Sequence, residues 1–568
     1  MVIKKIYLCL TLLFFLIITG FGQKANYKQY NFHPPLDIPL VLSANFGELR
    51  TNHFHTGIDF KTQRQTGHPV YSIDNGYVSR VKVSPWGYGH VVYIDHYNGL
   101  TSVYAHCEDF SGAIQELVRE IQKKQQNFEI DYYPSKDSLK VKKGEIIAVS
   151  GNTGGSSAPH LHFEIRETVN EHALNPLLFN FKIADTRKPL IRGVKVYALT
   201  QEGYRIEGKS QRINVNDANG KYTISGGKLI VPANYTSEKG GIGFAFDAVD
   251  QLNAANNICG IYSAALIVDN DTVFKQEMNT VYFSSNRQIN THKDYEEFHL
   301  RRKHFQKTFK TIHNPLPIYK KTVNNGILRF NPGSNHKVTY VCSDVEGNTS
   351  ELSFLLEISE GAVGETENLY EKGKYLFPDS AYMHFDETHY VLMPPGLLYE
   401  PTPLIIDYSQ GKLTFGDPEI PLQETFKLML PIDQKHPKEK YYVERSSKYR
   451  QYSETGAVHE GWITVWVRNF GTFEVKTDLS PPVIVRRNFI NKGSVRGKTL
   501  LWSIDDAESG LTDYDIFIDD RWYLLSWEPK KNVFYFEVPQ HLQGLKKLKI
   551  RATDACGNSS EEIYELEF

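Results

Sequence analysis

Short runs of β-forming residues, separated by turn residues, recur along most of this 568-residue chain and constrain its fold more than any other feature. The N-terminal third holds five such runs: Val70–Ile73, Val91–Asp95, Ser102–Tyr104, Ile146–Val149 and Leu161–Ile165. Branched and aromatic residues favour pleated strands, and the chain contains 34 Tyr and 32 Phe. The sequence therefore predicts a mostly β protein, with about four domains at roughly 150 residues each.

One segment has helical periodicity instead. Ile114, Leu117, Val118 and Ile121 stand at positions i, i+3, i+4 and i+7, which places them on one face of a helix. We predict an amphipathic helix over about 112–127.

Weak internal repetition divides the last two thirds of the chain. Asp185 and Asp478 each open a seven-residue stretch with Asp, Pro and Ile at identical spacing. Asp344-Val-Glu-Gly-Asn348 and Asp554-Ala-Cys-Gly-Asn558 stand near the ends of such stretches, and Asp250-Gln-Leu-Asn253 is a looser third copy. Asp, Gly and Asn supply hairpin turn geometry, and evenly spaced turns indicate sandwich modules.

These boundaries give the expected domain order. The first domain covers 32–182, with an insertion at 110–139 that includes the predicted helix. Immunoglobulin-like β-sandwiches are expected over 185–270 and 480–568. The region between them is divided into β-rich domains at 271–360 and 366–477.

The N-terminus has the pattern of a secretory signal peptide over residues 1–22. Lys4 and Lys5 precede an apolar run from Ile6 to Ile18, and small residues follow. An uncleaved membrane anchor is the alternative. We expect export across the inner membrane to the periplasm or cell envelope, with extracellular release open, and no membrane span after cleavage. The formal net charge of −2 gives nucleic-acid binding no support.

Four cysteines remain after the signal segment, and they are far apart with no CxxC pair. We expect buried free thiols instead of a disulfide framework.

Two histidines of one predicted strand form the centre of a candidate metal site. In His160-Leu-His162 both imidazoles lie on one face, because strand side chains alternate. His55 and Asp59 would be roughly 13 Å apart in a straight strand, but Gly57 between them allows a bend. Two His and one carboxylate, with a fourth position open to water, have the composition of a catalytic zinc site.

Peptide hydrolysis at such a site also needs a proton acceptor and a group that stabilises the oxyanion. His106 and His160 are the candidates. The sequence shows no Ser-His-Asp or Cys-His alternative, because Cys107 faces away from its neighbour His106 on a strand.

These segments resemble a known family. Arg50–Asp59, Tyr104-Ala-His106 and His160-Leu-His162 are similar to the three signature motifs of lysostaphin/LytM-type zinc endopeptidases. Five further segments resemble the same family: Gly67–Val78, Trp86–Val92, Val141–Glu145, Gly151–Gly154 and Asn175-Pro176. The resemblance covers roughly residues 40–180.

The resemblance implies an antiparallel β-sheet peptidase domain of the duplicated-hybrid-motif type, with its site in a groove. His55, Asp59 and His162 would bind one Zn²⁺ ion per chain. His160 would be the general base and His106 would stabilise the oxyanion or orient the water, although the sequence leaves open which of them takes the proton.

Three further residues are predicted to contact substrate. Arg50 would bind substrate or pair with a carboxylate, and Gly154 and Gly155 would cradle the substrate backbone or only form a turn.

The implied function is hydrolysis of peptide cross-links in peptidoglycan. The alternatives are a catalytically silent or autoinhibited envelope protein that controls other wall hydrolases, and a zinc peptidase that acts on proteins. All five metal and catalytic positions are filled, which favours activity. The β-sandwich domains would suit binding to envelope proteins, and the 110–139 insertion would border the groove.

Overall fold

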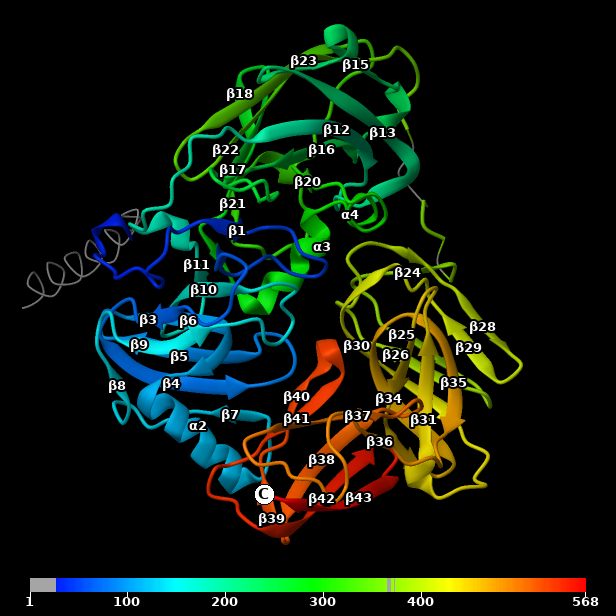
Figure 1. The fold of residues 1–568 in the computed structure, drawn as a ribbon. Helices are drawn as coiled ribbons and strands as arrows, with labels where there is room; N and C mark the ends of the chain where they lie inside the picture. Colours follow the sequence, from blue (N-terminus) through cyan, green and yellow to red (C-terminus); the bar gives the residue numbers. More distant parts are fainter. Residues whose placement is uncertain (1–26, 365–368, 372) are drawn as a thin grey trace, which may run out of the picture.

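The computed structural model describes residues 27–364, 369–371 and 373–568. Four β-rich units follow one another and form a ring, in which the fourth unit returns to the first (Figure 1). The predicted signal peptide lies outside the described residues. Within the described ranges, no helix is both long and apolar enough to cross a membrane. The prediction of a mostly β chain is confirmed.

An antiparallel sheet forms the first unit. Its strands are β1 (Leu42–Ala44), β2 (Ile58–Lys61), β3 (Pro69–Tyr71), β4 (Gly76–Val83), β5 (His90–His96), β6 (Leu100–Phe110), β7 (Ile130–Tyr132), β8 (Lys140–Val141), β9 (Ile146–Ser150), β10 (His160–Glu167) and β11 (Ala173–Leu174). The main path runs β1-β2-β10-β6-β5-β4-β7. The five predicted runs fall on β3, β5, β6, β9 and β10, which confirms them.

The predicted helix is α2 (Gly112–Gln125), between β6 and β7. It buries Ile114, Val118 and Ile121, as its periodicity predicts, and ends at Gln126 in the left-handed conformation. The helix lies between the sheet of the first unit and the fourth unit (Figure 1). Phe128 of the insertion lines one pocket together with Thr153 of the first unit and Trp527 of the fourth.

The second unit is a single large sheet that covers residues 190–358. Its strands are β12 (Leu190–Leu199), β13 (Arg205–Ala218), β14 (Lys221–Ile224), β15 (Lys228–Val231), β16 (Gly241–Val249), β17 (Ser263–Val268), β18 (Asp271–Glu277), β20 (Phe305–Lys307), β21 (Tyr319–Thr322), β22 (Asn335–Ser343) and β23 (Thr349–Ile358). β17 and β18 pair across the boundary placed at 270/271, so residues on both sides of it belong to one unit.

A helical segment of the second unit reaches toward the first. It contains η5 (Phe283–Gln288), α3 (Ile289–His292) and α4 (Tyr295–Arg301), while β19 (Thr280–Val281) pairs with β11 of the first sheet.

The third and fourth units are β-sandwiches. The third contains β24 (Tyr375–Leu376), β25 (Tyr382–Phe385), β26 (Tyr390–Met393), β27 (Thr402–Pro403), β28 (Ile406–Ser409), β29 (Lys412–Phe415), β30 (Pro421–Pro431), β31 (Tyr441–Ser446), β32 (Gln451–Glu454), β33 (Ala457–His459), β34 (Trp462–Asn469) and β35 (Gly471–Thr477). The fourth contains β36 (Val483–Arg486), β37 (Thr499–Asp505), β38 (Leu511–Ile518), β39 (Arg521–Tyr523), β40 (Ser526–Glu528), β41 (Val533–Glu537), β42 (Leu545–Asp554) and β43 (Ser559–Glu567). Each buries its own apolar core between two sheets.

The core of the first unit continues into the second. Met278 and Ile289 pack in the same buried cluster as Phe46 and Phe54. Gly47 has φ of 78°, and a Cβ there would lie 2.0 Å from the Met278 side chain. Only glycine fits this contact, and the two units share one hydrophobic interior.

Candidate metal centre

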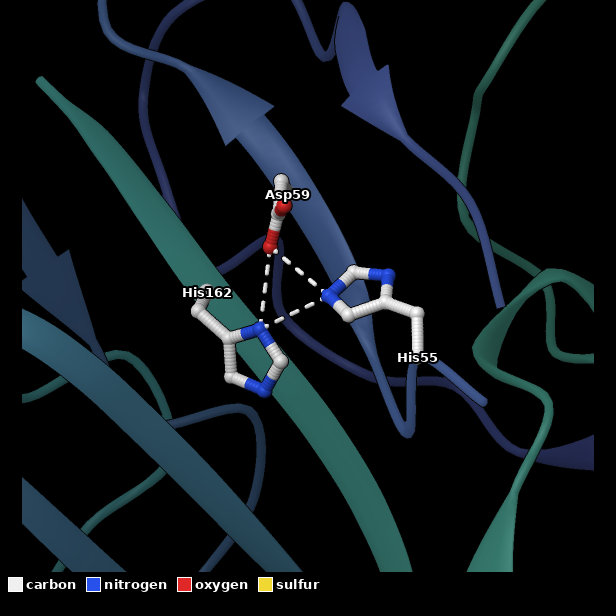
Figure 2. Close-up of side chains that lie close together, drawn as sticks. All are labelled: His55, Asp59 and His162. Carbon is white, nitrogen blue, oxygen red and sulfur yellow. Dashed lines mark hydrogen bonds and ion pairs between the residues drawn. The ribbon is translucent and has the colours of Figure 1, made fainter. Parts of the chain in front are cut away.

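His55, Asp59 and His162 converge at one point (Figure 2). His55 Nε2 lies 3.0 Å from His162 Nδ1 and 3.1 Å from Asp59 Oδ1, and the last two atoms are 2.9 Å apart. β2 and β10 pair antiparallel with Asp59 opposite His162, while His55 precedes β2. The structure thus brings the three predicted ligands together.

Gly57 was predicted to allow a bend, and the structure shows that it also allows close packing against β10. A Cβ at Gly57 would lie 2.4 Å from the Phe163 carbonyl oxygen and 2.9 Å from His162 Cε1. A larger residue would push β10 away from the segment that carries His55. The glycine therefore provides close packing between the two ligand-bearing segments.

The hydrogen bonds on the far side of each ring fix the tautomers. His55 Nδ1 lies 2.8 Å from the Asn45 carbonyl oxygen, which can only accept, so this nitrogen carries the hydrogen. His162 Nε2 likewise donates to Glu164 Oε1 at 2.8 Å. The two remaining nitrogens and the Asp59 oxygen therefore meet as three acceptors.

Three acceptors at this spacing fit a metal ion. Zinc bonds of 2.0–2.1 Å in tetrahedral geometry separate ligand atoms by roughly 3.3 Å, close to the spacing found here. With both rings in their neutral form, converging lone pairs repel each other unless a cation lies between them. The donor set of two imidazoles and one carboxylate is one that zinc favours.

The electrostatics of the pocket favour positive charge. Burial raises the pKa of Asp59, but the charges and hydrogen bonds of His55 and His162 outweigh it and hold that pKa well below its usual range. Burial lowers the pKa of His162, yet hydrogen bonds and charges from Asp59 and Glu164 raise it to about 9. A metal cation would take the place of the proton that His162 Nδ1 would otherwise bind next to Asp59.

Glu164 is a site residue that the sequence analysis missed. Its side chain is fully buried. It accepts hydrogen bonds from His162, from the Tyr88 hydroxyl at 2.5 Å and from Thr56 Oγ1 at 2.7 Å, and it pairs with Arg166 at 2.6 Å. The alternation of β10 was the available signal, because His160, His162 and Glu164 share one face.

His106 and His160 flank the three predicted ligands, with ring centroids 4.8 Å apart. His106 Nδ1 donates to the Thr153 carbonyl at 2.9 Å, and His160 Nδ1 donates to the Ala158 carbonyl at 2.8 Å. Each Nε2 is left as a lone pair, and that of His160 lies 3.6 Å from Asp59 Oδ1. Both rings are therefore oriented to accept a proton.

Burial lowers the pKa of both flanking histidines. For His106 the neighbouring His162 and His160 lower it further, to about 3. For His160 burial outweighs the opposing charge of Asp59. The backbone also shapes this site: His106 has φ of 60°, and the pairing of β6 with β9 is irregular immediately after it. Such bulges redirect side chains.

The three predicted substrate contacts lie around the same site. Arg50 reaches Asp59 Oδ2 and Glu48 Oε1 at 3.6 Å each. A Cβ at Gly154 would lie 2.3 Å from the Gly89 nitrogen, so this glycine is needed for close loop packing. Gly155 donates its N–H to Gly87 O at 2.8 Å. A role in substrate binding stays a prediction for all three.

The cysteines take no part in this chemistry. Cys107, Cys259, Cys342 and Cys556 are buried and free, as predicted. Burial raises the pKa of the Cys107 thiol to about 12, which disfavours a reactive thiolate next to His106.

The segment before β2 is held by the second unit, which local sequence could not indicate. Asn286 accepts from the Phe54 N–H at 2.6 Å and donates to the Phe54 carbonyl at 3.2 Å. The Lys293 ammonium donates to the carbonyl oxygens of Arg50, at 2.6 Å, and Thr51. The backbone that leads into His55 is thus fixed from outside the first unit.

The fourth unit reaches the opposite side of the site through the β40–β41 hairpin. Lys530 donates to the carbonyl oxygens of Asn152 and Ser156, the latter at 3.1 Å. Trp527 packs edge-on against Trp86 with ring centroids 5.4 Å apart. Residues of both units line a shared pocket beside Thr153.

Comparison with known proteins agrees with the motifs. Residues 53–126 and 128–176 match the model of Peptidase family M23, and residues 375–478 match the Zu5-like domain. The predicted resemblance to lysostaphin/LytM-type peptidases is confirmed. The Zu5-like match falls on the third unit.

Relatives and solved structures match the first unit. DD-carboxypeptidase/endopeptidase Mpg of Neisseria meningitidis is 35% identical over 147 residues, which cover 24% of this chain and 27% of that protein. Peptidoglycan DD-endopeptidase ShyA of Vibrio cholerae is 29% identical over 158 residues, 27% of this chain and 30% of that protein. The catalytic domain of EnpA from Enterococcus faecalis is 27% identical, with a TM-score of 0.20, and the match covers 26% of this chain and 95% of that one. The chain thus spans about a quarter of the length of the curated relatives it matches.

Proposed function

We propose that this protein is a zinc-dependent endopeptidase that hydrolyses peptide cross-links of peptidoglycan in the periplasm or cell envelope. The observation that carries the proposal is the meeting of three acceptor atoms, from His55, Asp59 and His162, beside two imidazoles that are ready to accept a proton. The names of the relatives Mpg and ShyA support the substrate class.

The residues of the chain have distinct tasks in this reaction. A zinc ion held by His55, Asp59 and His162 would polarise the scissile carbonyl and lower the pKa of water toward about 7. His106 and His160 are neutral near pH 7 and present Nε2 lone pairs, so either can take the proton of the attacking water. The ring that has taken it becomes a donor, which can stabilise the oxyanion or protonate the leaving amine.

Muropeptide release from isolated sacculi tests the activity. We expect full-length protein to release products from cross-linked dimers, and a zinc chelator to stop it. The masses of the products identify the cleaved bond. Protein that holds one zinc per chain but releases nothing would contradict catalysis and support the silent regulatory alternative or a protein substrate.

Elemental analysis tests the metal separately. We expect one zinc per chain in the wild type. We expect none in His162→Ala, because that variant loses the ligand that lies next to both His55 and Asp59. His384→Ala is the matched control, since His384 is half-buried and belongs to a different His-Asp-His group, in the third unit. Equal zinc content in wild type and His162→Ala would remove the proposed centre.

A further inference from the structure

Three aspartates meet at the junction between the first two units, beside a cavity that Asn45 also lines. One ligand oxygen from each of Asp185, Asp250 and Asp344 lies within 4.8 Å of the others. Asp185 belongs to the segment before β12, Asp250 directly follows β16, and Asp344 directly follows β22. Three separate segments therefore bring carboxylates to one point.

One of these carboxylates has a buried oxygen with no partner. Asp250 is only 2% exposed, and its Oδ1 makes no hydrogen bond. Asp185 accepts from the Arg187 N–H at 3.1 Å, and Asp344 accepts from the Asn348 N–H at 2.9 Å and its side-chain amide at 2.6 Å. A buried, unpaired carboxylate oxygen is unfavourable unless something binds it.

Among the described residues no lysine or arginine forms an ion pair with the three carboxylates, although the Arg187 charge acts on Asp185 and Asp250 from a distance. The nearby Arg187 guanidinium donates to the Ala255 carbonyl and to Gln251, not to the aspartates. Asp250 and Asp344 are buried and Asp185 is half-buried, so three negative charges at this point are unfavourable unless a cation lies among them.

A small cavity of about 20 Å³ adjoins the three carboxylates, and Glu346 also lines it. This volume holds a single small ion or a water molecule. These acidic side chains offer a metal ion only carboxylate oxygens as ligands. Hard cations prefer such ligands, and Ca²⁺ tolerates irregular sites of six to eight oxygens better than Mg²⁺ does.

The fourth unit contains an instructive counterpart. Asp478, Asp506 and Asp554 form a cluster of the same composition, and Asp478 and Asp554 belong to the same sequence repeats as Asp185 and Asp344. There Asp478 Oδ2 accepts from the Ser509 N–H and hydroxyl, at 3.1 and 2.5 Å. Asp554 Oδ1 accepts from two backbone N–H groups at 2.8 Å, and Asp506 Oδ2 from the Gly510 N–H at 2.6 Å. The protein itself supplies donors to all three carboxylates.

We propose that Asp185, Asp250 and Asp344 bind one Ca²⁺ ion, which fastens the segment leaving the first unit to the sheet of the second. The loop after Asp250 carries Gly260, whose N–H and C=O both bond the Asn45 side chain at 2.8 and 2.7 Å. Asn45 in turn holds His55 through its carbonyl. The cation thus stabilises a loop that supports a predicted zinc ligand.

Terbium luminescence tests this site in the full-length, zinc-loaded protein. Tyr262 lines the cavity and would sensitise bound Tb³⁺. We expect one Tb³⁺ per chain, displaced by Ca²⁺ with a dissociation constant of about 10⁻⁴ to 10⁻³ M, the range of extracellular calcium modules. Asp250→Asn should weaken Ca²⁺ binding at least tenfold, and Asp506→Asn, in the satisfied cluster, should leave it unchanged.

Absence of saturable Tb³⁺ or Ca²⁺ binding in the wild type would overturn the proposal, and so would unchanged affinity in folded Asp250→Asn. Asp185→Asn, at a half-buried position, is the second variant if Asp250→Asn does not fold, and the same tenfold loss is expected. His162→Ala should keep Ca²⁺ binding, so failure of the peptidase proposal and failure of the calcium proposal are distinguishable.

Discussion

At the scale of single residues, the partner behind each imidazole decides what its other nitrogen can do. Asn45 and Glu164 accept the far-side hydrogens of His55 and His162, which leaves the near-side nitrogens as lone pairs that a metal ion could bind. Backbone carbonyls do the same for His106 and His160, whose free nitrogens become proton acceptors. Such outer partners commonly matter nearly as much as the ligands.

His160→Ala should keep zinc and lose most hydrolytic activity, because removal of a general base typically costs about 10²–10⁴ in rate. Zinc content and muropeptide release measure the two effects. His172→Ala, on the same unit but outside the site, is the control. Wild-type rates in His160→Ala would transfer the base role to His106.

Lys293 should make stability depend on pH. Burial and the nearby Arg287 lower its pKa from 10.5 to about 7. Between these values the unfolded chain binds more protons than the folded one, so stability rises with pH from about 7 to 10. One pKa unit corresponds to 1.36 kcal/mol, so the total rise from this group is at most about 5 kcal/mol.

Denaturant titrations of wild type and Lys293→Met across that pH range measure this effect. The rise should be smaller in Lys293→Met and unchanged in Lys321→Met, which removes an exposed lysine of the same unit. Parallel pH curves for wild type and Lys293→Met would contradict the assignment.

At the scale of elements, the second unit completes the first. The segment from Asn45 to Thr56 has little regular structure of its own, yet it carries His55. Asn286 bonds both backbone groups of Phe54, as a neighbouring strand would, and Lys293 holds the turn before it. The positions of β2 and β10 alone therefore do not fix the ligand set.

Asn286→Ala should weaken zinc binding and lower stability by about 1–3 kcal/mol, because it leaves buried backbone groups of Phe54 unpaired. Asn488→Ala is the matched control: Asn488 brackets backbone groups of Thr499 and Leu501 in the same way, but in the fourth unit. Competition with a zinc chelator measures the affinity. Equal zinc affinity in the two variants would show that the two Asn286–Phe54 hydrogen bonds do not support the site.

Strand alternation explains how much of the site could be predicted. His160 and His162 share a face of β10, and His55, Gly57 and Asp59 form a compact motif, so local sequence was sufficient for them. Glu164 continues the same alternation, so it could also have been predicted as a site residue from the sequence.

Other site residues were beyond local sequence. Asn286 and Lys293 contact the site from more than 230 residues away, and no local pattern encodes such a contact. The boundary placed at 270 divided the β17–β18 hairpin, whose turn residues Asp269 and Asn270 both have positive φ.

At the scale of the whole molecule, the ring brings the fourth unit to the loop beside the candidate metal centre. The 152–156 loop contains Thr153 and Ser156, which contact the His106 and His160 rings. Lys530 and Trp527 of the fourth unit rest on that loop and on Trp86. We therefore expect the hairpin to limit the space available to a bulky substrate at this end of the candidate site.

A Trp527→Ala/Lys530→Ala double variant should hydrolyse intact sacculi several-fold faster and small soluble muropeptides at an unchanged rate. Zinc content should stay at one per chain, because the predicted ligands come from β2, β10 and the segment before β2. Trp466→Ala, exposed on the third unit, is the control. Slower hydrolysis of both substrates would show instead that the hairpin supports the loop.

The bond from Lys293 to the segment before His55 also sets an order of events during biosynthesis. Its two ends are 243 residues apart in the chain. At the usual 5–20 residues per second, synthesis of that length takes roughly 12–50 s, while N-terminal domains begin to fold first. A nascent chain therefore carries the ligand motifs long before it can fix them, and we expect hydrolytic capacity to arise late, when the second unit has emerged and docked.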